Sequence, residues 1–138
     1  MPKAAPIAVL ALAPLLAAAL AAGSSAFAGS GKPRPRPEPS PAARPVGTPT
    51  SCIPLNQIRE SKVRDDWTID FVAAGKRAWR NTLTARCPGL RINNAITYET
   101  SLNQLCNTDI VYVLETAGGI RRGAACSLGQ FVPVELER

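Results

Sequence analysis

The sequence predicts an all-β domain, in the form of a small antiparallel roll or barrel of five to six short strands. Three observations support this prediction. Apolar and polar side chains alternate along residues 67–83, which is the period of a strand with one buried face. Residues 110–114 form a short run of large apolar side chains, typical of a strand inside a sheet. Between residues 51 and 138, turn-forming residues recur about every ten positions.

Residues 68–83 are expected to form a β-hairpin with a three-residue loop at 74–76. The numbers of facing residues then add up to 150, so Phe71 lies opposite Trp79 on an apolar face. A two-residue loop would suit a type II′ turn, but it shifts the register by one residue and sets Phe71 beside Arg80. We therefore expect the three-residue loop.

The other face of this hairpin is polar. Asp70 lies opposite Arg80, and Thr68 lies opposite Thr82. One pair of opposite charges and one pair of threonines suit the solvent side of an antiparallel sheet. We expect this face to be open to solvent and available for contact with a partner.

The first 28 residues are interpreted as a secretory signal. Lys3 precedes an apolar run over residues 4–22, and Ala26-Phe27-Ala28 provides an A-x-A cleavage site. An uncleaved membrane anchor is the alternative, but Pro14 interrupts the run and small residues follow it. We expect a periplasmic or secreted protein with no membrane span after cleavage.

Residues 29–50 are expected to be a disordered, Pro-rich, basic tether. Seven of these 22 residues are proline, and large apolar side chains are scarce. The segment has four cationic side chains and one carboxylate, at Lys32, Arg34, Arg36, Arg44 and Glu38. It is interpreted as a solvated spacer, the alternative being an arm that touches a polyanion of the cell envelope.

The globular domain is expected to span residues 51–138. It contains eleven of the sixteen Lys and Arg residues and nine of the ten Asp and Glu residues, so its net charge is only +2. The cations are dispersed along the chain without an accompanying series of aromatic side chains, which argues against nucleic-acid binding.

The four cysteines predict two disulfides. An even number of widely spaced cysteines behind a secretory signal is typical of a disulfide-stabilised domain. Zinc is disfavoured because the chain has no histidine and no C-x-x-C pair. Of the three possible connectivities we prefer Cys52–Cys126, which would join the ends of the domain, with Cys87–Cys106 in its middle.

The other predicted elements are short. Residues 110–114 are expected to be a central strand buried on both faces, and residues 116–119 a turn. The remaining expectations are a turn or single helical turn at 51–55, extended chain at 59–64 and 92–99, a turn at 87–89, a loop or single helical turn at 101–106, and final strands at 120–125 and 131–134.

The spacing of these motifs resembles a known family. The pattern C-I-P-L, D-D-x-T-I-x-F, C-P-G-L, L-C-x-x-D-I-V-x-V-L-E and G-A-A-C-x-L-G-x-F-x-P-V over residues 52–134 is similar to a family of small exported proteobacterial four-cysteine domains of unknown function. The resemblance implies an exported protein with a single domain. It implies no activity.

No catalytic residue is predicted from the sequence. The chain lacks histidine, and its thiols are expected to be oxidised. Ser61-Lys62 is disfavoured as a catalytic pair because neighbouring strand residues point to opposite faces. Asp65, Asp66 and Asp70 could hydrolyse a substrate or bind calcium, but they are better explained as the polar corner of a hairpin. Asp109 is interpreted as a cap for a turn.

The sequence therefore favours a non-catalytic binding or scaffolding module of the cell envelope, without a cofactor or metal. Its partner would be an envelope protein or polyanion. The predicted contact surface consists of four residues, Asp70, Arg80, Arg121 and Arg122. The alternative is a small envelope hydrolase, or an inhibitor of one that acts through a protruding loop at 115–123.

Overall fold

The structure is a computed structural model that describes residues 36 and 38–137. The predicted secretory signal and the first part of the predicted tether lie outside the described residues. Within the described part of the chain, no helix is long and apolar enough to cross a membrane.

The described residues form ten strands in three antiparallel sheets, which confirms the all-β prediction. Of the predicted roll or barrel of five to six short strands, the closed barrel and the number of strands were wrong, because the described residues form ten strands and the largest sheet is open, with different strands at its two edges. Its five strands, in spatial order, are β1 (Ala43–Pro45), β10 (Phe131–Leu136), β5 (Arg77–Thr82), β4 (Thr68–Val72) and β3 (Glu60–Val63).

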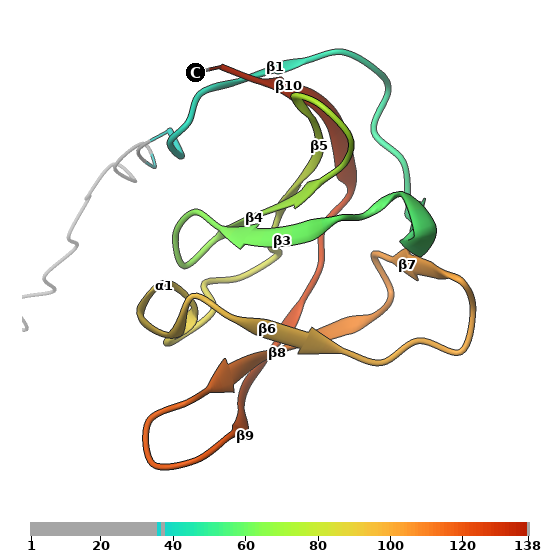
Figure 1. The fold of residues 1–138 in the computed structure, drawn as a ribbon. Helices are drawn as coiled ribbons and strands as arrows, with labels where there is room; N and C mark the ends of the chain where they lie inside the picture. The colour runs from blue at the N-terminus through green and yellow to red at the C-terminus, as the bar shows by residue number, and fades with distance from the viewer. Residues whose placement is uncertain (1–35, 37, 138) are drawn as a thin grey trace, which may run out of the picture. The chain divides into compact units, whose positions relative to one another are not determined.

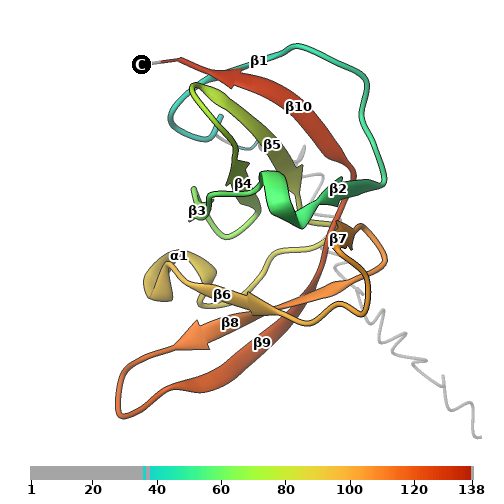
Figure 2. The same cartoon turned by 45° about the vertical axis from the view of Figure 1, so that its right-hand side comes forward.

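Two smaller sheets complete the fold. A three-stranded sheet contains β6 (Ile96–Tyr98), β8 (Ile110–Glu115) and β9 (Arg121–Ser127), and a two-stranded sheet contains β2 (Cys52–Pro54) and β7 (Gln104–Cys106). In Figures 1 and 2 the β8–β9 hairpin extends away from the five-stranded sheet. The short helices are η1 (Leu55–Gln57) and α1 (Leu90–Asn93).

The predicted hairpin register is confirmed. In the β4–β5 pair, Phe71 is opposite Trp79 and Asp70 is opposite Arg80. The main core forms on the Phe71 side, where the rings of Phe71 and Phe131 meet edge to face at 5.6 Å between centroids. This core also includes fully buried aliphatic side chains from several elements, among them Ile53, Ile69, Leu83, Leu90, Leu105, Val111 and Val113.

A buried asparagine connects this sheet to the loop between β9 and β10. Asn81 is fully buried; its amide nitrogen donates to the carbonyl oxygen of Gly129 at 2.7 Å, and its amide oxygen accepts from the Gly129 N–H at 2.9 Å. A Cβ atom at position 129 would lie 2.2 Å from the Thr82 carbonyl oxygen, so only glycine fits this close approach. The burial and the hydrogen bonds of Asn81 are therefore accounted for by this structural role.

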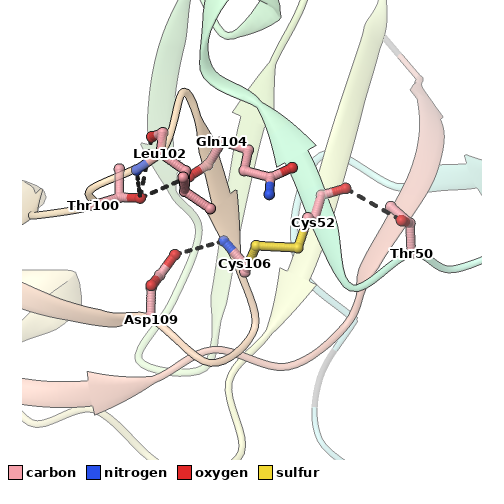
Figure 3. Close-up of a disulfide and its surroundings, with 7 residues drawn as sticks. All are labelled: Thr50, Cys52, Thr100, Leu102, Gln104, Cys106 and Asp109. Carbon is pink, nitrogen blue, oxygen red and sulfur yellow. Dashed lines mark hydrogen bonds between the residues drawn. A yellow bond between two sulfur atoms is a disulfide. The ribbon is translucent and has the colours of Figure 1, made fainter.

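Both disulfides form, but the predicted connectivity was wrong: the bridges are Cys52–Cys106 and Cys87–Cys126. The first joins facing residues of β2 and β7, whose Cα atoms are 4.0 Å apart (Figure 3). The sequence analysis missed this pair because it did not expect residues 104–106 to be a strand. Two oxidised pairs suggest an oxidising compartment.

Two local expectations also need correction. Residues 92–99 are not extended throughout, because α1 runs to Asn93 and the next residue, Asn94, has a left-handed φ of 49° before β6 begins. Strand β8 is central in its sheet, as expected, but Val111 and Val113 are buried while their neighbours are half-buried. One face of β8 therefore packs in the core.

The ordered unit begins before Ser51, which corrects the predicted domain boundary. Strand β1 pairs with β10 in antiparallel register, and the backbone of Thr50 makes two hydrogen bonds to Phe131 at 2.9 Å. Residues 43–45 of the predicted tether are thus a strand of the sheet, and Thr50 forms a further bridge to it. Ala43 packs with Val72, Ala78 and other apolar side chains in a second, smaller core.

Candidate functional site: an arginine-lined pocket

A pocket of about 670 Å³ lies on the side of the five-stranded sheet that carries Asp70. This volume falls in the range of small-molecule sites, roughly 300–1,000 Å³. Its wall includes five arginines and three carboxylates: Arg36, Arg64, Arg80, Arg86, Arg91, Glu38, Asp65 and Asp66. We call it the arginine pocket.

Two arginines of the pocket share one buried carboxylate. Asp70 is fully buried; it accepts from Arg64 Nε at 2.7 Å, and from Arg80 through Nε at 2.8 Å and Nη2 at 2.9 Å. The side chains of Arg64 and Arg80 are 15% and 11% exposed. Two guanidinium groups with one carboxylate leave an excess positive charge where little water screens it. We call these three residues the Asp70 cluster.

The N-terminal segment explains why this polar face is covered. Arg80 Nη2 donates to the carbonyl oxygen of Pro41 at 2.8 Å, and residues 38–40 contribute to the pocket wall. The expectation that Asp70 and Thr68 face solvent was therefore wrong: they are 0% and 4% exposed. Strand alternation identified the face correctly, but a segment distant in sequence determined its burial.

A second cluster lies nearer the surface. Asp66 accepts from Arg86 through Nη2 at 2.7 Å and Nε at 3.2 Å, and from the backbone N–H of Arg91 at 3.0 Å. The hydrogen bond from the Arg91 amide, followed by that from the Arg86 side chain, lowers the pKa of Asp66. Asp66 is therefore ionised at neutral pH and fixes Arg86 beside the pocket.

Arg36 and Trp67 form one wall of the pocket. The Arg36 guanidinium carbon lies 4.1 Å from the centroid of the Trp67 ring, which is a cation–π distance. Trp67 is half-buried at the start of β4. An aromatic surface beside arginines can contact the apolar body of a ligand while the guanidinium groups bind its charge.

The four predicted contact residues do not form one surface. Arg80 lines the arginine pocket and Asp70 is the buried carboxylate bonded to it, whereas Arg121 and Arg122 lie on β9 in the three-stranded sheet. There Arg121 Nε donates to Glu115 at 2.6 Å, and Arg122 bonds to Glu99 and lies over the Tyr112 ring. The hydrogen bond that Arg122 donates to Glu99 raises the pKa of Arg122, so Arg122 stays charged.

The sequence analysis missed Arg64, although the information to find it was present. In the β3–β4 pair, Lys62 faces Asp70, and the Arg64 N–H donates to the Thr68 carbonyl. Extending the predicted hairpin by one strand would have set Arg64 diagonal to Asp70. Arg86 lies in the loop after β5 and Arg91 in the short helix α1, and strand periodicity predicts the position of neither side chain.

The acids considered for catalysis all make structural interactions. Asp65 Oδ1 accepts from the Trp67 N–H at 2.7 Å, and Asp109 Oδ2 accepts from the Cys106 N–H at 2.7 Å (Figure 3). The first bond is typical of an Asx turn, and the second stabilises the turn that leads into β8. Within residues 36 and 38–137, no group of three or more acidic or cysteine side chains is arranged to hold a metal.

Comparisons with family models, with curated proteins and with solved structures found no match. The resemblance to exported four-cysteine domains therefore stays a prediction, and function is inferred from the site.

Proposed function

We propose that this chain is an exported, non-catalytic binding module of the cell envelope, and that the arginine pocket binds an anionic group of its partner. The group would be a carboxylate or a phosphate, because guanidinium groups donate two parallel hydrogen bonds to either. Export is inferred from the predicted secretory signal and is consistent with two disulfides.

The observation that carries this proposal is the composition of the Asp70 cluster. A nearly buried group with two cations and one anion is stabilised when a second anion approaches. Among the described residues, the hydrogen bonds of the Arg64 guanidinium use Nε, so its two terminal amino groups remain available to a ligand at the pocket. The nearby Arg91 side chain adds a cation at the pocket wall.

The roles of the carboxylates favour binding over hydrolysis. A glycosidase or aspartyl hydrolase needs a carboxyl that can exchange a proton near neutral pH. Asp66 is instead held ionised by its hydrogen-bond donors, and Asp70 is enclosed between two guanidinium groups. Both carboxylates therefore position arginines.

A direct test follows the arginine Nε–H signals by NMR while phosphate or citrate is added at constant ionic strength. We expect the signals of Arg64 and Arg80 to shift with a saturable dependence on concentration. Arg91→Gln should weaken this binding by about threefold to tenfold, as expected for loss of one cation near an anion site. Arg64→Gln should weaken it at least as much.

Arg77→Gln is the matched control. Arg77 lies on β5 and is exposed, so this variant removes the same charge outside the arginine pocket. Equal affinities for Arg91→Gln, Arg64→Gln and Arg77→Gln would overturn the proposal. So would the absence of any shift at Arg64 and Arg80.

A second candidate function rests on the β8–β9 hairpin. This hairpin projects from the rest of the fold in Figures 1 and 2, and Ile120 near its tip is 80% exposed. A protruding loop with an exposed apolar side chain suits an inhibitor that enters the active site of an envelope hydrolase. If this is correct, Ile120→Asp should abolish inhibition of hydrolases in an envelope extract, and Arg91→Gln should not.

A further inference from the structure

The segment of residues 38–42, which we call the strap, lies at the arginine pocket. Glu38, Pro39 and Ser40 contribute to the pocket wall, and the Pro41 carbonyl accepts a hydrogen bond from Arg80 Nη2 at 2.8 Å. A donor of the proposed anion site is therefore already occupied by the protein's own backbone.

The two ends of the strap are held very differently. At its C-terminal end, the Ala42 carbonyl accepts from the Glu137 N–H at 2.9 Å, and β1 then pairs with β10. Towards its other end, Glu38 and Ser40 are exposed, the hydrogen bond from Arg80 is its contact with the Asp70 cluster, and the Arg36 guanidinium just before the strap lies over the Trp67 ring at 4.1 Å. A segment with few buried contacts opens locally at small free-energy cost.

The sequence of the strap suits a reversible contact with arginines. Proline alternates with other residues at Glu38-Pro39-Ser40-Pro41, and proline lacks a backbone N–H. The strap therefore offers mainly carbonyl and carboxylate oxygens, which are the acceptors that guanidinium groups require. Because proline also restricts the unbound chain, little conformational entropy is lost when the strap docks.

We propose that the strap is a built-in competitor for the anion site and leaves the pocket when an anionic ligand binds. The inference rests on the proposed function. A ligand carboxylate or phosphate would exchange the neutral Pro41 carbonyl on Arg80 for a charged oxygen, which accepts a stronger hydrogen bond. Glu38 adds a negative charge at the pocket wall that repels the ligand until the strap moves away.

Strap release would couple the pocket to the chain that precedes it. The strap lies between the anchored β1 strand and the Pro-rich residues before position 36. Ligand binding would release residues 38–42 from the pocket wall.

NMR relaxation of the disulfide-bonded, exported protein tests this inference, with citrate as the probe. The amide of Ser40 should lose order over the same citrate concentrations at which the Arg64 and Arg80 Nε–H signals shift. The amide of Arg44, inside β1, should keep its order and serves as the internal control. If the arginine signals shift while Ser40 stays ordered, the strap inference fails and the anion site stands. If no arginine signal shifts, the proposed function itself fails.

A pair of charge variants provides the second test. Glu38→Gln should raise the affinity for citrate by about threefold, since it removes one like charge from the pocket wall. Glu135→Gln removes the same charge from a residue that pairs with Arg44 outside the pocket, and it should leave the affinity unchanged. Equal affinities for the two variants, or weaker binding by Glu38→Gln, would overturn the role of Glu38.

Discussion

The arginine pocket and the β8–β9 hairpin use the same types of side chain in opposite settings. In the Asp70 cluster, two guanidinium groups share one fully buried carboxylate. On the hairpin, Arg121 and Arg122 have one carboxylate each, and their side chains are 72% and 49% exposed. The first arrangement leaves a surplus cation with little screening, and the second is neutral and hydrated.

This difference shows that adjacent basic residues in a sequence do not by themselves identify a site. Arg121-Arg122 is conspicuous in the sequence, yet each partner is a nearby surface carboxylate. Arg64 and Arg80 are sixteen positions apart and meet because β3 and β5 both flank β4. The candidate site is distinguished by the burial of its side chains and by its excess of guanidinium groups over carboxylates.

The largest expected effect tests the buried side of the comparison. Asp70→Ala should reduce the free energy of unfolding by about 3–5 kcal/mol, because it leaves two guanidinium groups without their carboxylate in a nearly buried position. Glu115→Ala, at the hairpin, should cost less than about 1 kcal/mol. Urea unfolding of both variants measures the difference, and similar costs would contradict the contrast drawn between the two regions.

The next effect concerns the segment that covers the pocket. A chain beginning at Ser51 lacks β1 and the backbone bonds of Thr50, and it should lose roughly 2 kcal/mol or more of stability through several missing hydrogen bonds. A chain beginning at Arg36 keeps them and is the control. Thermal unfolding of the two chains measures the difference. Equal melting temperatures would mean that β1 does not stabilise the sheet.

A smaller effect depends on pH. The lowered pKa of Asp66 means that its ionised form stabilises the folded state above the ordinary aspartate value of about 3.9. That stabilisation is lost as the pH falls through the lower pKa of the folded state. Asp66→Asn should therefore be less stable than the parent protein at pH 6, and the difference should shrink as the pH falls below the ordinary aspartate value of about 3.9.

Arg86→Gln should remove part of the same pH dependence, because Arg86 is the second cause of the lowered pKa. Unfolding by urea across the acid range measures both variants. A difference for Asp66→Asn that grows towards low pH would have the wrong sign and would contradict this assignment.

The smallest effect is expected at the hairpin. Arg121→Gln removes an exposed ion pair with Glu115 and should change the free energy of unfolding by no more than about 0.5 kcal/mol. It should also leave the affinity for citrate unchanged. A loss of citrate binding would place the anion site on the hairpin and reverse the comparison.

The sequence alone was sufficient for the local structure of the β4–β5 hairpin and for the presence of two disulfides. The alternation around Phe71 and Trp79 predicted the β4–β5 register, because a shift of one residue would have mixed the two faces. Four cysteines behind an apparent secretory signal predicted two bridges. Both inferences depend on residue type and short spacing.

Tertiary structure determined which residues those elements contact. Cys52 pairs with Cys106 because β2 and β7 become neighbours, and Asp70 is buried because β3 brings Arg64 and the N-terminal segment brings Pro41. These contacts join residues far apart in the chain, so no local periodicity encodes them. The charge and burial of the arginine pocket follow from such long-range packing, and its proposed function therefore became visible only in the folded chain.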